Sequence, residues 1–313
     1  MSPESSERQL LTVVELANAK VIGNVRMVAT NKDVVVWGVQ SLYGAATPQD
    51  HYLLGRRRFR VPRRRRGTAL LLGAANSDNY YHWLLDSLPR WNLLQQANFL
   101  DYDYVLLHDR PCRFQDETLD RLKVPREKRL RCSKNFVHQF DRLVVPAMPF
   151  PLEEVSAWAC ECVRSIFSER ACAPERLYLS RRGARRRRLV NELHLETSLK
   201  SLGFFSVQPE MLSVAEQARL FSSARCVVAP HGASLTNMVF APRGAMLIEL
   251  FHPQHKNRSY LNLAAVCGHR YANLEGRATN PATDRHLEYE IEVAAVLQML
   301  VSTGYVDDFA PCV

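Results

Sequence analysis

One segment in the C-terminal third, residues 226–253, constrains the fold of this 313-residue chain more than any other. Residues 226–229 are apolar and predict a buried strand, which runs into a turn of small residues at 230–233. A helix is predicted from about Ser234, and a second apolar strand carries Glu249 near its carboxyl end. Ligands of open α/β sheets bind beyond the carboxyl ends of the strands, and a helix N-terminus there attracts anions. The segment therefore predicts a cradle for the phosphates of a nucleotide, with a carboxylate close by for a sugar hydroxyl.

The turn itself admits two interpretations. Gly232 and Ala233 lack bulk, so an anionic ligand can approach the backbone closely. The imidazole of His231 can bond a phosphate or a sugar in the same place. The alternative is an ordinary strand–turn–helix unit, in which Gly232 only permits the turn and His231 satisfies a backbone group. The local sequence leaves both interpretations open.

Composition limits the class of protein. Apolar residues make up 47% of the chain and charged residues 23%, which is typical of a globular protein of two domains. No run approaches the ~20 apolar residues of a spanning helix, and the N-terminus lacks the basic-then-apolar order of a signal peptide. We therefore expect a cytoplasmic protein. The 8 cysteines form no Cys-x-x-Cys pair and match no zinc spacing, so we predict no metal site.

The net charge of +9 comes mainly from arginine. Residues 56–66 include eight arginines, and residues 185–188 are all arginine. Such runs favour anionic partners. A nucleic-acid-binding protein would use them through counterion release, but no aromatic ladder or nucleic-acid motif accompanies them. An anionic membrane surface is a second possible partner for the first run, and a solvated loop is the plain alternative.

The order of predicted elements indicates an α/β protein. Short β-rich runs separated by turn signals predict a meander over residues 10–45, and the first arginine run is expected to follow as a loop or sheet edge. From residue 69 onwards, strands alternate with helices, which favours parallel α/β layers. A strand is predicted at 34–39 within the meander.

Proline-rich residues 146–151 are the predicted linker between two domains. We therefore expect residues 1–150 to form the meander and a first domain, and residues 151–285 to form a second. A helix is predicted at 288–302 within a C-terminal segment, 286–313, and we expect it to pack back on the first domain.

Arginines also follow the strand predicted at 176–180. Arg181 comes directly after that strand, and Arg187 lies four residues before Asn191, ahead of the next helix. Guanidinium groups hold a diphosphate through paired hydrogen bonds and keep their charge. They can neutralise a leaving diphosphate, a role otherwise taken by Mg²⁺. A basic surface loop is the alternative, and the adjacent arginines leave the choice of Arg187 ambiguous.

A helix predicted at 78–88, ending near Pro89, carries a third candidate. His82 and Asp86 are four residues apart and share a helix face. A carboxylate in that position fixes the imidazole tautomer and raises its basicity, which is the usual support for a general base. Two alternatives remain open: an ion pair between Asp86 and Arg90, and a buried, structural His82 beside Trp83.

Taken together, these segments resemble glycosyltransferase family 61, a group of inverting transferases. The matching text lies in segments of consistent order and separation, namely Asn-Tyr-Tyr-His-Trp-Leu-Leu-Asp at 79–86, Leu-Ser-Arg-Arg at 179–182, Arg-Arg-Leu-Val-Asn-Glu at 187–192, Glu-Gln at 216–217, Pro-His-Gly-Ala-Ser-Leu-Thr-Asn-Met at 230–238, Phe-Ala-Pro-Arg-Gly-Ala at 240–245 and Ile-Glu-Leu at 248–250. The similarity spans residues 70–275 and is most specific in the segment at 230–250.

The resemblance implies a GT-B architecture, in which two facing Rossmann-like domains share an active site. It implies that the first domain binds the acceptor and that His82 and Asp86 are the catalytic pair, either of which could be the base. It implies that the second domain binds the nucleotide-sugar, with Glu249 near the ribose. By position, the donor-binding residues would be Arg181, Arg187, His231, Gly232, Ala233, Asn237 and Glu249.

The resemblance also implies partners. The donor is expected to be UDP-linked, the acceptor a saccharide or a lipid-linked sugar, and no metal or other cofactor is required. The chain resembles bacterial cytosolic members associated with capsule, exopolysaccharide or lipopolysaccharide assembly. Peripheral contact with the inner membrane would then use residues 56–66, and nucleic acid is not an expected partner.

Overall fold

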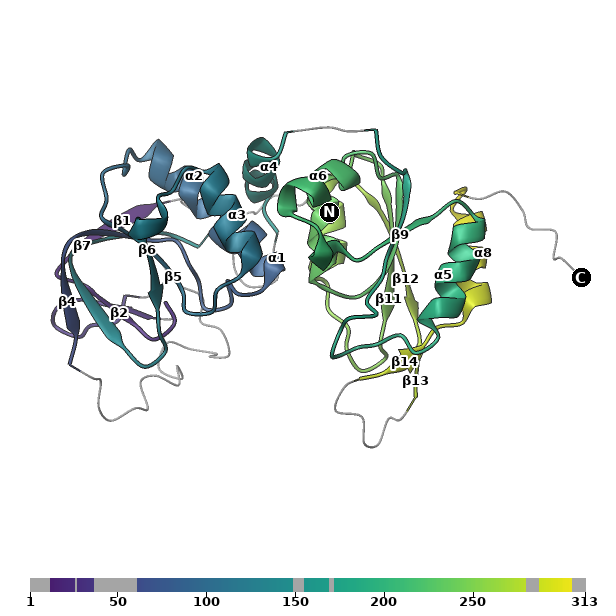
Figure 1. Ribbon diagram of the computed structural model, residues 1–313, viewed down its shortest axis with the longest axis horizontal. Coiled ribbons are helices and arrows are strands. Elements are labelled where there is room, and N and C mark those ends of the chain that lie inside the picture. Colours follow the sequence, from purple (N-terminus) through teal and green to yellow (C-terminus); the bar gives the residue numbers. More distant parts are fainter. Residues whose placement is uncertain are drawn as a thin grey trace, which may run out of the picture. The chain divides into compact units, whose positions relative to one another are not determined.

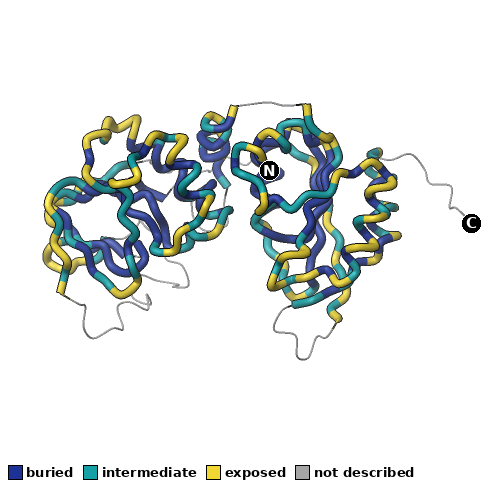
Figure 2. The backbone as a smooth tube through the Cα atoms, viewed as in Figure 1, coloured by how far each residue is buried: buried dark blue, intermediate teal, exposed yellow. Residues whose placement is uncertain are grey.

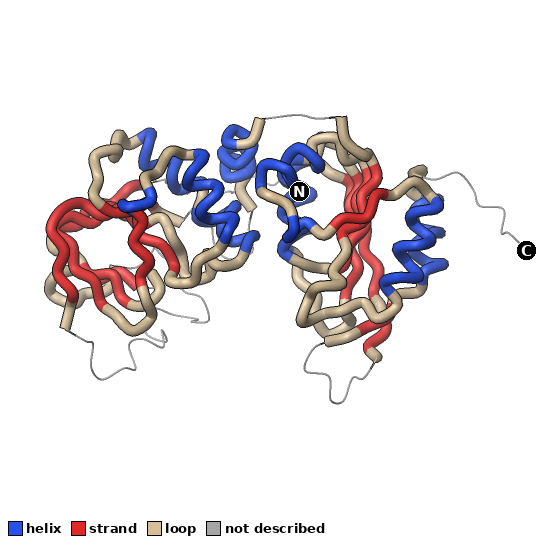
Figure 3. Tube along the Cα trace, viewed as in Figure 1, coloured by secondary structure: helices blue, strands red, loops and turns tan. Residues whose placement is uncertain are grey.

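The computed structural model describes residues 12–25, 27–36, 61–148, 155–168, 172–279 and 287–305. The chain forms two compact units, Met1–Ile166 and Phe167–Val313, here named the N-terminal and C-terminal units (Figure 1). Each has a sheet with helices packed on it (Figure 3), and the strands hold the most buried residues (Figure 2). The predicted α/β class is confirmed. No helix within the described residues is long and apolar enough to cross a membrane.

The sheet of the N-terminal unit has a parallel part and an antiparallel part. Strands β7, β4, β5 and β6 are parallel in that order, while β1, β2 and β3 form the antiparallel part that the meander predicted. The chain moves from β4 outwards through β5 to β6 and then returns to β7 on the other side of β4. Such a reversal is a topological switch point, where α/β proteins bind ligands. The strands are β1 (Val13–Ala17), β2 (Lys20–Ile22), β3 (Met27–Ala29), β4 (Arg63–Leu71), β5 (Tyr104–His108), β6 (Arg129–Cys132) and β7 (Val137–Pro146).

The meander is less regular than predicted. In the strand expected at 34–39, Val35 forms only an isolated bridge with Ala29, and residues 37–39 lie outside the described residues.

The helices of this unit extend further than the sequence predicted. They are α1 (Tyr80–His82), the π-helical turn η2 (Trp83–Ser87), α2 (Pro89–Gln96), α3 (Arg113–Arg121), the 3-10 turn η3 (Arg126–Lys128) and α4 (Ala157–Ile166). The helix was predicted to stop near Pro89, but Pro89 instead begins α2, because the first position of a helix needs no N–H. Helix α4 packs on η2 and α2, so the units divide after Ile166 and not at the predicted 150/151.

The second half of the first arginine run is part of a strand. Arg63, Arg64 and Arg65 of β4 pair with residues 138–140 of β7, whereas β5 pairs only with residues 69–71 of β4. The arginines therefore extend the strand beyond its neighbour β5. Of the two expectations, a loop or a sheet edge, the sheet edge fits this half, because its arginines pair with a strand on one side only. Arg63 also lies over the ring of Phe136 at 3.5 Å. Residues 56–60 lie outside the described residues.

The C-terminal unit contains a fully parallel five-stranded sheet in the order β9-β8-β10-β11-β12. In chain order this is 2-1-3-4-5, a doubly wound Rossmann-like arrangement whose switch point lies between β8 and β10. The strands are β8 (Arg176–Leu179), β9 (Phe205–Val207), β10 (Cys226–Pro230), β11 (Met246–Phe251) and β12 (Arg270–Glu275). A short hairpin pairs β13 (Arg277–Ala278) with β14 (Tyr289–Glu290).

Helices cover both faces of this sheet. They are α5 (Glu192–Ser201), α6 (Val214–Phe221), α7 (Ser259–Cys267) and α8 (Val293–Ser302), with 3-10 helices η4 (Pro209–Met211) and η5 (Ala233–Phe240). Helices α5 and α8 lie side by side on one face (Figure 1). The predicted helix at 288–302 thus exists, but its expected packing on the first domain is wrong. Val296 and Leu300 of α8 are fully buried in the core of the C-terminal unit, because they repeat every four residues and face the sheet.

Candidate functional site

Two residues meet at the switch point of the C-terminal sheet. Arg181 follows β8 and Gly232 follows β10, the neighbouring strand. A methyl group on Gly232 would stand 1.9 Å from Nη1 of Arg181, so the guanidinium lies directly against the glycine backbone. The backbone of Gly232 is extended, with φ of −178°, a conformation open to any residue. Glycine therefore leaves the space in which the guanidinium lies, and Arg181 fills the space that the sequence assigned to a ligand.

Arg181 is held in place by groups around its backbone and side chain. Its N–H donates to Oε1 of the buried Glu192 at 2.6 Å, and Glu192 also accepts from the hydroxyl of Tyr178. Nη2 of Arg181 donates to the carbonyl of Arg186 at 3.3 Å. Its Nε is buried and has no partner among the described residues. An unpaired buried donor costs ~1–3 kcal/mol, which an anionic ligand would recover.

Arg187 lies close to Arg181. Its backbone is in the left-handed region, with φ of 57°, which is uncommon for a residue with a side chain. Nη1 of Arg187 donates to Nε2 of His255 at 2.5 Å. Burial, and then the charge of Arg187, lower the pKa of His255 to about 4, so its ring nitrogen can accept. Burial and the charge of Arg181 also lower the pKa of Arg187. Two neighbouring cations that oppose each other's charge form a site suited to an anion.

Glu249 has a different role from the one expected. Its side chain is fully buried, with Oε1 accepting from Nδ1 of His231 at 2.5 Å and Oε2 accepting from the hydroxyl of Tyr271 at 2.7 Å. Both carboxylate oxygens are therefore used inside the unit, and no surface remains for a ribose hydroxyl. The carboxylate orients His231, and the expected contact of Glu249 with a ribose stays a prediction that this burial does not favour.

His231 is also turned inward. The backbone N–H of Ser259 donates to Oδ1 of Asn257 at 3.1 Å, which fixes the orientation of that amide. Nδ2 of Asn257 then donates to Nε2 of His231 at 3.3 Å. Both ring nitrogens of His231 are thus engaged by protein groups, and the residue is buried. We conclude that His231 joins β10 to β11 and to the segment before α7, and the expected contact with phosphate or sugar does not fit this geometry.

Ala233 and Asn237, the remaining predicted donor-binding residues, lie in different surroundings on η5. Ala233 is half-buried and begins η5 beside Gly232, where the first amides of a helix lack partners within it. Asn237 is fully buried and donates to Oε1 of Gln217 at 2.6 Å and to the carbonyl of Ser234 at 2.9 Å. Asn237 therefore fixes η5 to α6, which does not fit its predicted contact with the donor.

The predicted catalytic pair forms in the N-terminal unit. Nδ1 of His82 lies 2.6 Å from Oδ2 of Asp86, and the side chains are 17% and 24% exposed. Asp86 belongs to the π-helical turn η2, where the N–H of Leu88 donates to the carbonyl of Trp83, five residues earlier, at 2.8 Å. Such π-turns are rare and frequently occur at functional sites. The side chain of Asp86 thus reaches back from this turn to His82, four residues earlier.

Arg90 rules out the alternative ion pair with Asp86, because its guanidinium is fully buried and bonds four times to backbone carbonyls. Nε and Nη2 donate to Pro146 at the end of β7, and Nη1 donates to Leu72 and Gly73 after β4. Burial lowers the pKa of Arg90 to about 9, opposed by the charge of Asp86. Arg90 therefore closes the switch point of the N-terminal sheet as a structural clamp.

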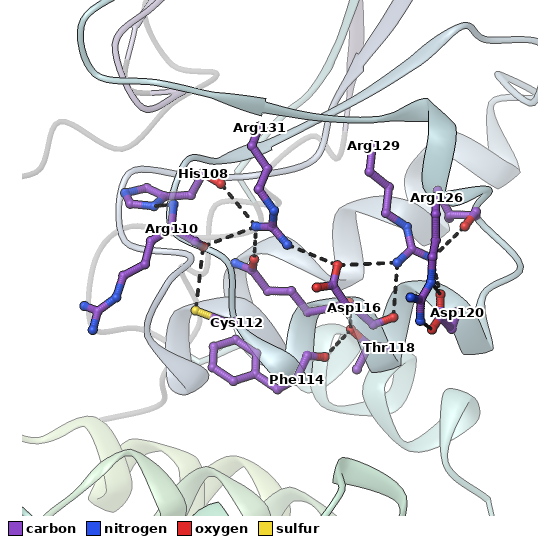
Figure 4. A network of polar contacts seen from close by, with 12 residues as sticks. His108, Arg110, Cys112, Phe114, Asp116, Thr118, Asp120, Arg126, Arg129 and Arg131 are labelled. Atoms are coloured by element: carbon purple, nitrogen blue, oxygen red, sulfur yellow. Dashed lines mark hydrogen bonds and ion pairs between the residues drawn. The ribbon is translucent and has the colours of Figure 1, made fainter.

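A network on α3 supports the turn that follows His82. Arg129 and Arg131 of β6 reach the carboxylates of Asp116 and Asp120 on α3, as Figure 4 shows. Arg131 also donates to the carbonyl of His108 at the end of β5. These contacts attach α3 to the sheet through charged groups.

Helix α3 then holds η2. Nε1 of Trp83 donates to Oγ1 of Thr118 on α3 at 2.8 Å, and the rings of Tyr80 and Phe114 meet edge to face at 5.3 Å. The residue next to His82 is thus fixed by a helix that was not predicted from the sequence.

Sequence reasoning also missed His255, Asn257 and Tyr271. In sequence they lie 22 to 68 residues from the groups that they hold, and no motif includes them. The signal that could have found them is their position, since the first two follow β11 at the carboxyl edge of the sheet. Within the described ranges, no group of three His, Cys, Asp or Glu side chains is arranged to hold a metal ion.

Comparison with known proteins identifies a family for this chain. The family model for Glycosyltransferase 61 matches residues 80–248, more than half of the chain and most of the predicted site. The EGF domain-specific O-linked N-acetylglucosamine transferase of Drosophila melanogaster is 33% identical over 103 residues, 32% of this chain and 19% of that protein. The Pan troglodytes protein of the same name is 30% identical over 101 residues, 31% of this chain and 19% of that protein. The matched region thus spans about a fifth of the length of these curated relatives. On the match of the family model, the chain belongs to glycosyltransferase family 61.

Proposed function

We propose that this glycosyltransferase moves a sugar from a nucleotide-sugar donor to a hydroxyl of a saccharide or lipid-linked acceptor, with inversion at the anomeric carbon. One observation carries the proposal: Arg181 lies against Gly232 at the switch point of a parallel sheet, with Arg187 beside it. Two guanidinium groups at such an edge suit a diphosphate in charge and in hydrogen-bonding geometry.

The proposed reaction needs one base and one charged leaving-group site. His82, with its Nδ1–H held by Asp86, takes the proton of the acceptor hydroxyl on Nε2, or Asp86 takes it directly. The hydroxyl oxygen attacks the anomeric carbon, and the bond from that carbon to the diphosphate oxygen breaks with its electron pair on the diphosphate. Arg181 and Arg187 stabilise that charge. Attack from the face opposite the diphosphate inverts the anomeric centre, and the scheme requires no metal ion.

The proposal extends to the arrangement of the domains, the type of donor and the place of the reaction in the cell. It includes a GT-B arrangement, a UDP-linked donor, and a place in capsule, exopolysaccharide or lipopolysaccharide assembly in the bacterial cytoplasm. A peripheral contact with anionic lipid is supported by Arg63, Arg64 and Arg66, which are exposed on β4. None of these three pairs with a carboxylate in the described part of the chain, so their charges are available to a surface.

The test is a donor screen. The chain is incubated with UDP-, GDP-, CMP- and TDP-sugars, including the N-acetylglucosamine donor that the relatives' names suggest, and a mixed panel of glycoside acceptors. Release of nucleotide identifies the donor, and proton NMR coupling of the new linkage gives its anomeric configuration. We expect one donor class to be consumed, with inversion, and turnover by H82A to fall by about 10²–10⁴-fold. Retention would refute the mechanism, and an inert protein that binds only nucleic acid or lipid would refute the function.

A further inference from the structure

A pocket lies next to the arginine site in the C-terminal unit. It lies beyond the carboxyl ends of β8 and β9, one strand away from the contact between Arg181 and Gly232. Its volume of about 320 Å³ falls within the range of small-molecule sites, which is about 300–1,000 Å³. The lining residues are Ser180, Glu196, Ser206, Val207, Gln208, Met211 and Leu212.

The pocket lies on the side of the sheet that α5 covers. Ser206 is the register partner of Tyr178, and partners on neighbouring parallel strands share a face. Tyr178 packs in the core beneath α5 and bonds Glu192 of that helix. Ser206 therefore faces α5, and Glu196, which projects from α5, closes the same side. Ser180 and Gln208 follow two residues after Tyr178 and Ser206, which returns them to this face.

The lining favours a neutral ligand with polar edges. It contains no cation, and its one charged group is the carboxylate of Glu196, so it suits neither a phosphate nor an anionic sugar. Val207, Met211 and Leu212 supply an apolar wall, and Met211 is 70% exposed at the mouth. The hydroxyl of Ser206 and the amide of Gln208 make no side-chain hydrogen bond to a described residue, so both remain available.

Glu196 adds a group suited to a ribose. One of its carboxylate oxygens, Oε2, accepts from Arg182, while Oε1 makes no hydrogen bond within the described residues. Doubly wound folds commonly bind ribose hydroxyls with a carboxylate near the switch point. This role was assigned to Glu249 from sequence, but Glu249 is enclosed by His231 and Tyr271.

We infer that this pocket binds the nucleoside part of the donor, with the base against Met211 and Leu212 and the ribose at Glu196. The inference rests on the proposed function and deepens it. Ser180 lines the pocket and Arg181, the next residue, lies at the diphosphate site, so one extended ligand reaches both. Neighbouring strands are about 4.8 Å apart, which is less than the length of a nucleoside diphosphate.

The test separates the nucleoside from the diphosphate. Dissociation constants are measured by titration calorimetry for UDP, GDP, CDP, dTDP and inorganic pyrophosphate with wild type, S206W, Q208A and R181Q. L193W is the matched control, because Leu193 is on α5, 67% exposed and outside the pocket lining. We expect S206W to weaken the preferred nucleoside diphosphate at least tenfold and Q208A at least threefold, with pyrophosphate unchanged. R181Q should weaken both ligands, and L193W neither.

The outcomes distinguish the two claims. Nucleoside diphosphate binding that stays within twofold of wild type in both S206W and Q208A would overturn the pocket, even if catalysis remains. Equal losses for nucleoside diphosphate and pyrophosphate in Q208A would also overturn it, because the pocket would then act only through the arginines. Failure of wild type to bind any nucleoside diphosphate would refute the proposed function itself. Thermal unfolding confirms that each variant is folded. If S206W does not fold, the binding constants of Q208A alone decide whether the pocket binds the nucleoside.

Discussion

Each unit of the protein carries a histidine bonded to a carboxylate and an arginine at the end of a parallel strand, and the two sets differ in exposure. In the N-terminal unit the pair is open: His82 and Asp86 are 17% and 24% exposed, while Arg90 is fully buried among carbonyls. In the C-terminal unit the pair is closed: the side chains of His231 and Glu249 are 8% and 0% exposed, while Nε of Arg181 has no partner among the residues that the structure describes.

The difference shows that residue type does not decide between structure and function. Arg90 and Arg181 both stand at a switch point, but the donors of Arg90 are used by Pro146, Leu72 and Gly73. A charged group whose donors are all paired inside the protein holds the fold. Arg181 has a buried Nε without a partner among the described residues and lies at a switch point, which together suit a ligand. Exposure supports the same division for the histidines: the side chain of His82 is 17% exposed and remains the catalytic candidate, whereas that of His231 is 8% exposed and acts as a structural residue.

The largest effect should come from breaking the open pair. H82A and D86N should each lower kcat by about 10²–10⁴-fold, the usual contribution of a general base, with little change in the KM of the donor. H231N in the closed pair serves as the comparison and should act mainly on stability. Steady-state kinetics with saturating acceptor measures all three. Turnover within threefold of wild type for both H82A and D86N would remove the pair from the mechanism.

The second effect concerns the buried arginine. R90M removes a guanidinium that bonds three carbonyl groups at the ends of β4 and β7, so it should lower the unfolding free energy of the N-terminal unit on the order of 3 kcal/mol. R181M should lower stability by less than about 1 kcal/mol, because Arg181 makes one side-chain hydrogen bond to a described residue. Urea unfolding measures both. Equal losses of unfolding free energy in R90M and R181M would contradict the assignment of Arg90 as structural and Arg181 as ligand-binding.

A smaller effect sharpens the assignment of the closed pair. Y271F removes the hydroxyl that donates to Oε2 of Glu249, so it should destabilise the C-terminal unit by about 1.5 kcal/mol. The pH profile of kcat should stay unchanged, because His231 touches no reacting atom in this account. A shift of that profile in Y271F, at normal stability, would show instead that His231 takes part in proton transfer.

The smallest effect is a dependence of stability on pH. Burial and neighbouring arginines lower the pKa of His138 and of His255 to about 4, from an ordinary value of 6.5. The unfolded chain therefore binds more protons than the folded chain between these values, and stability should fall as the pH falls from about 6.5 towards 4. H138Q should flatten this slope in the N-terminal unit and H255Q in the C-terminal unit. Stability is measured from unfolding curves at pH 7 and pH 5. A loss of stability between these two pH values that is equal in wild type and in both variants would contradict the prediction.

The sequence predicted local contacts well and distant ones poorly. His82 and Asp86 are four residues apart, so helical spacing alone brought them together, and the strands at 104–108 and 226–230 follow from their apolar runs. The inward turn of His231 depends on Asn257 and Tyr271, which are separated from it in sequence by other elements. Spacing cannot show which of two histidines is enclosed, because enclosure is set by the packing of β11, β12 and α7.

The packing of α8 was predicted wrongly for the same reason, because it too depends on contacts distant in sequence. Its apolar period predicted a helix but not a partner, and Val296 and Leu300 fit any apolar face. The choice is made by the hairpin before it, where the N–H of Tyr289 donates to the carbonyl of Arg188 and fixes the chain to the C-terminal unit. Pro89 failed as a stop signal for a similar reason, since proline is tolerated at a helix start.

The central claim is that the guanidinium of Arg181, which lies against the backbone of Gly232, binds the diphosphate of the donor. The most direct test is a double-mutant cycle on the dissociation constants of inorganic pyrophosphate and UDP, with R181Q, G232A and the double variant. The methyl group of G232A displaces the guanidinium without backbone strain, so each single change should weaken binding on the order of 10- to 100-fold. The account predicts that the double variant binds no worse than the weaker single variant, because both changes remove one contact. Wild-type affinity in G232A, or losses that add fully in the double variant, would contradict it.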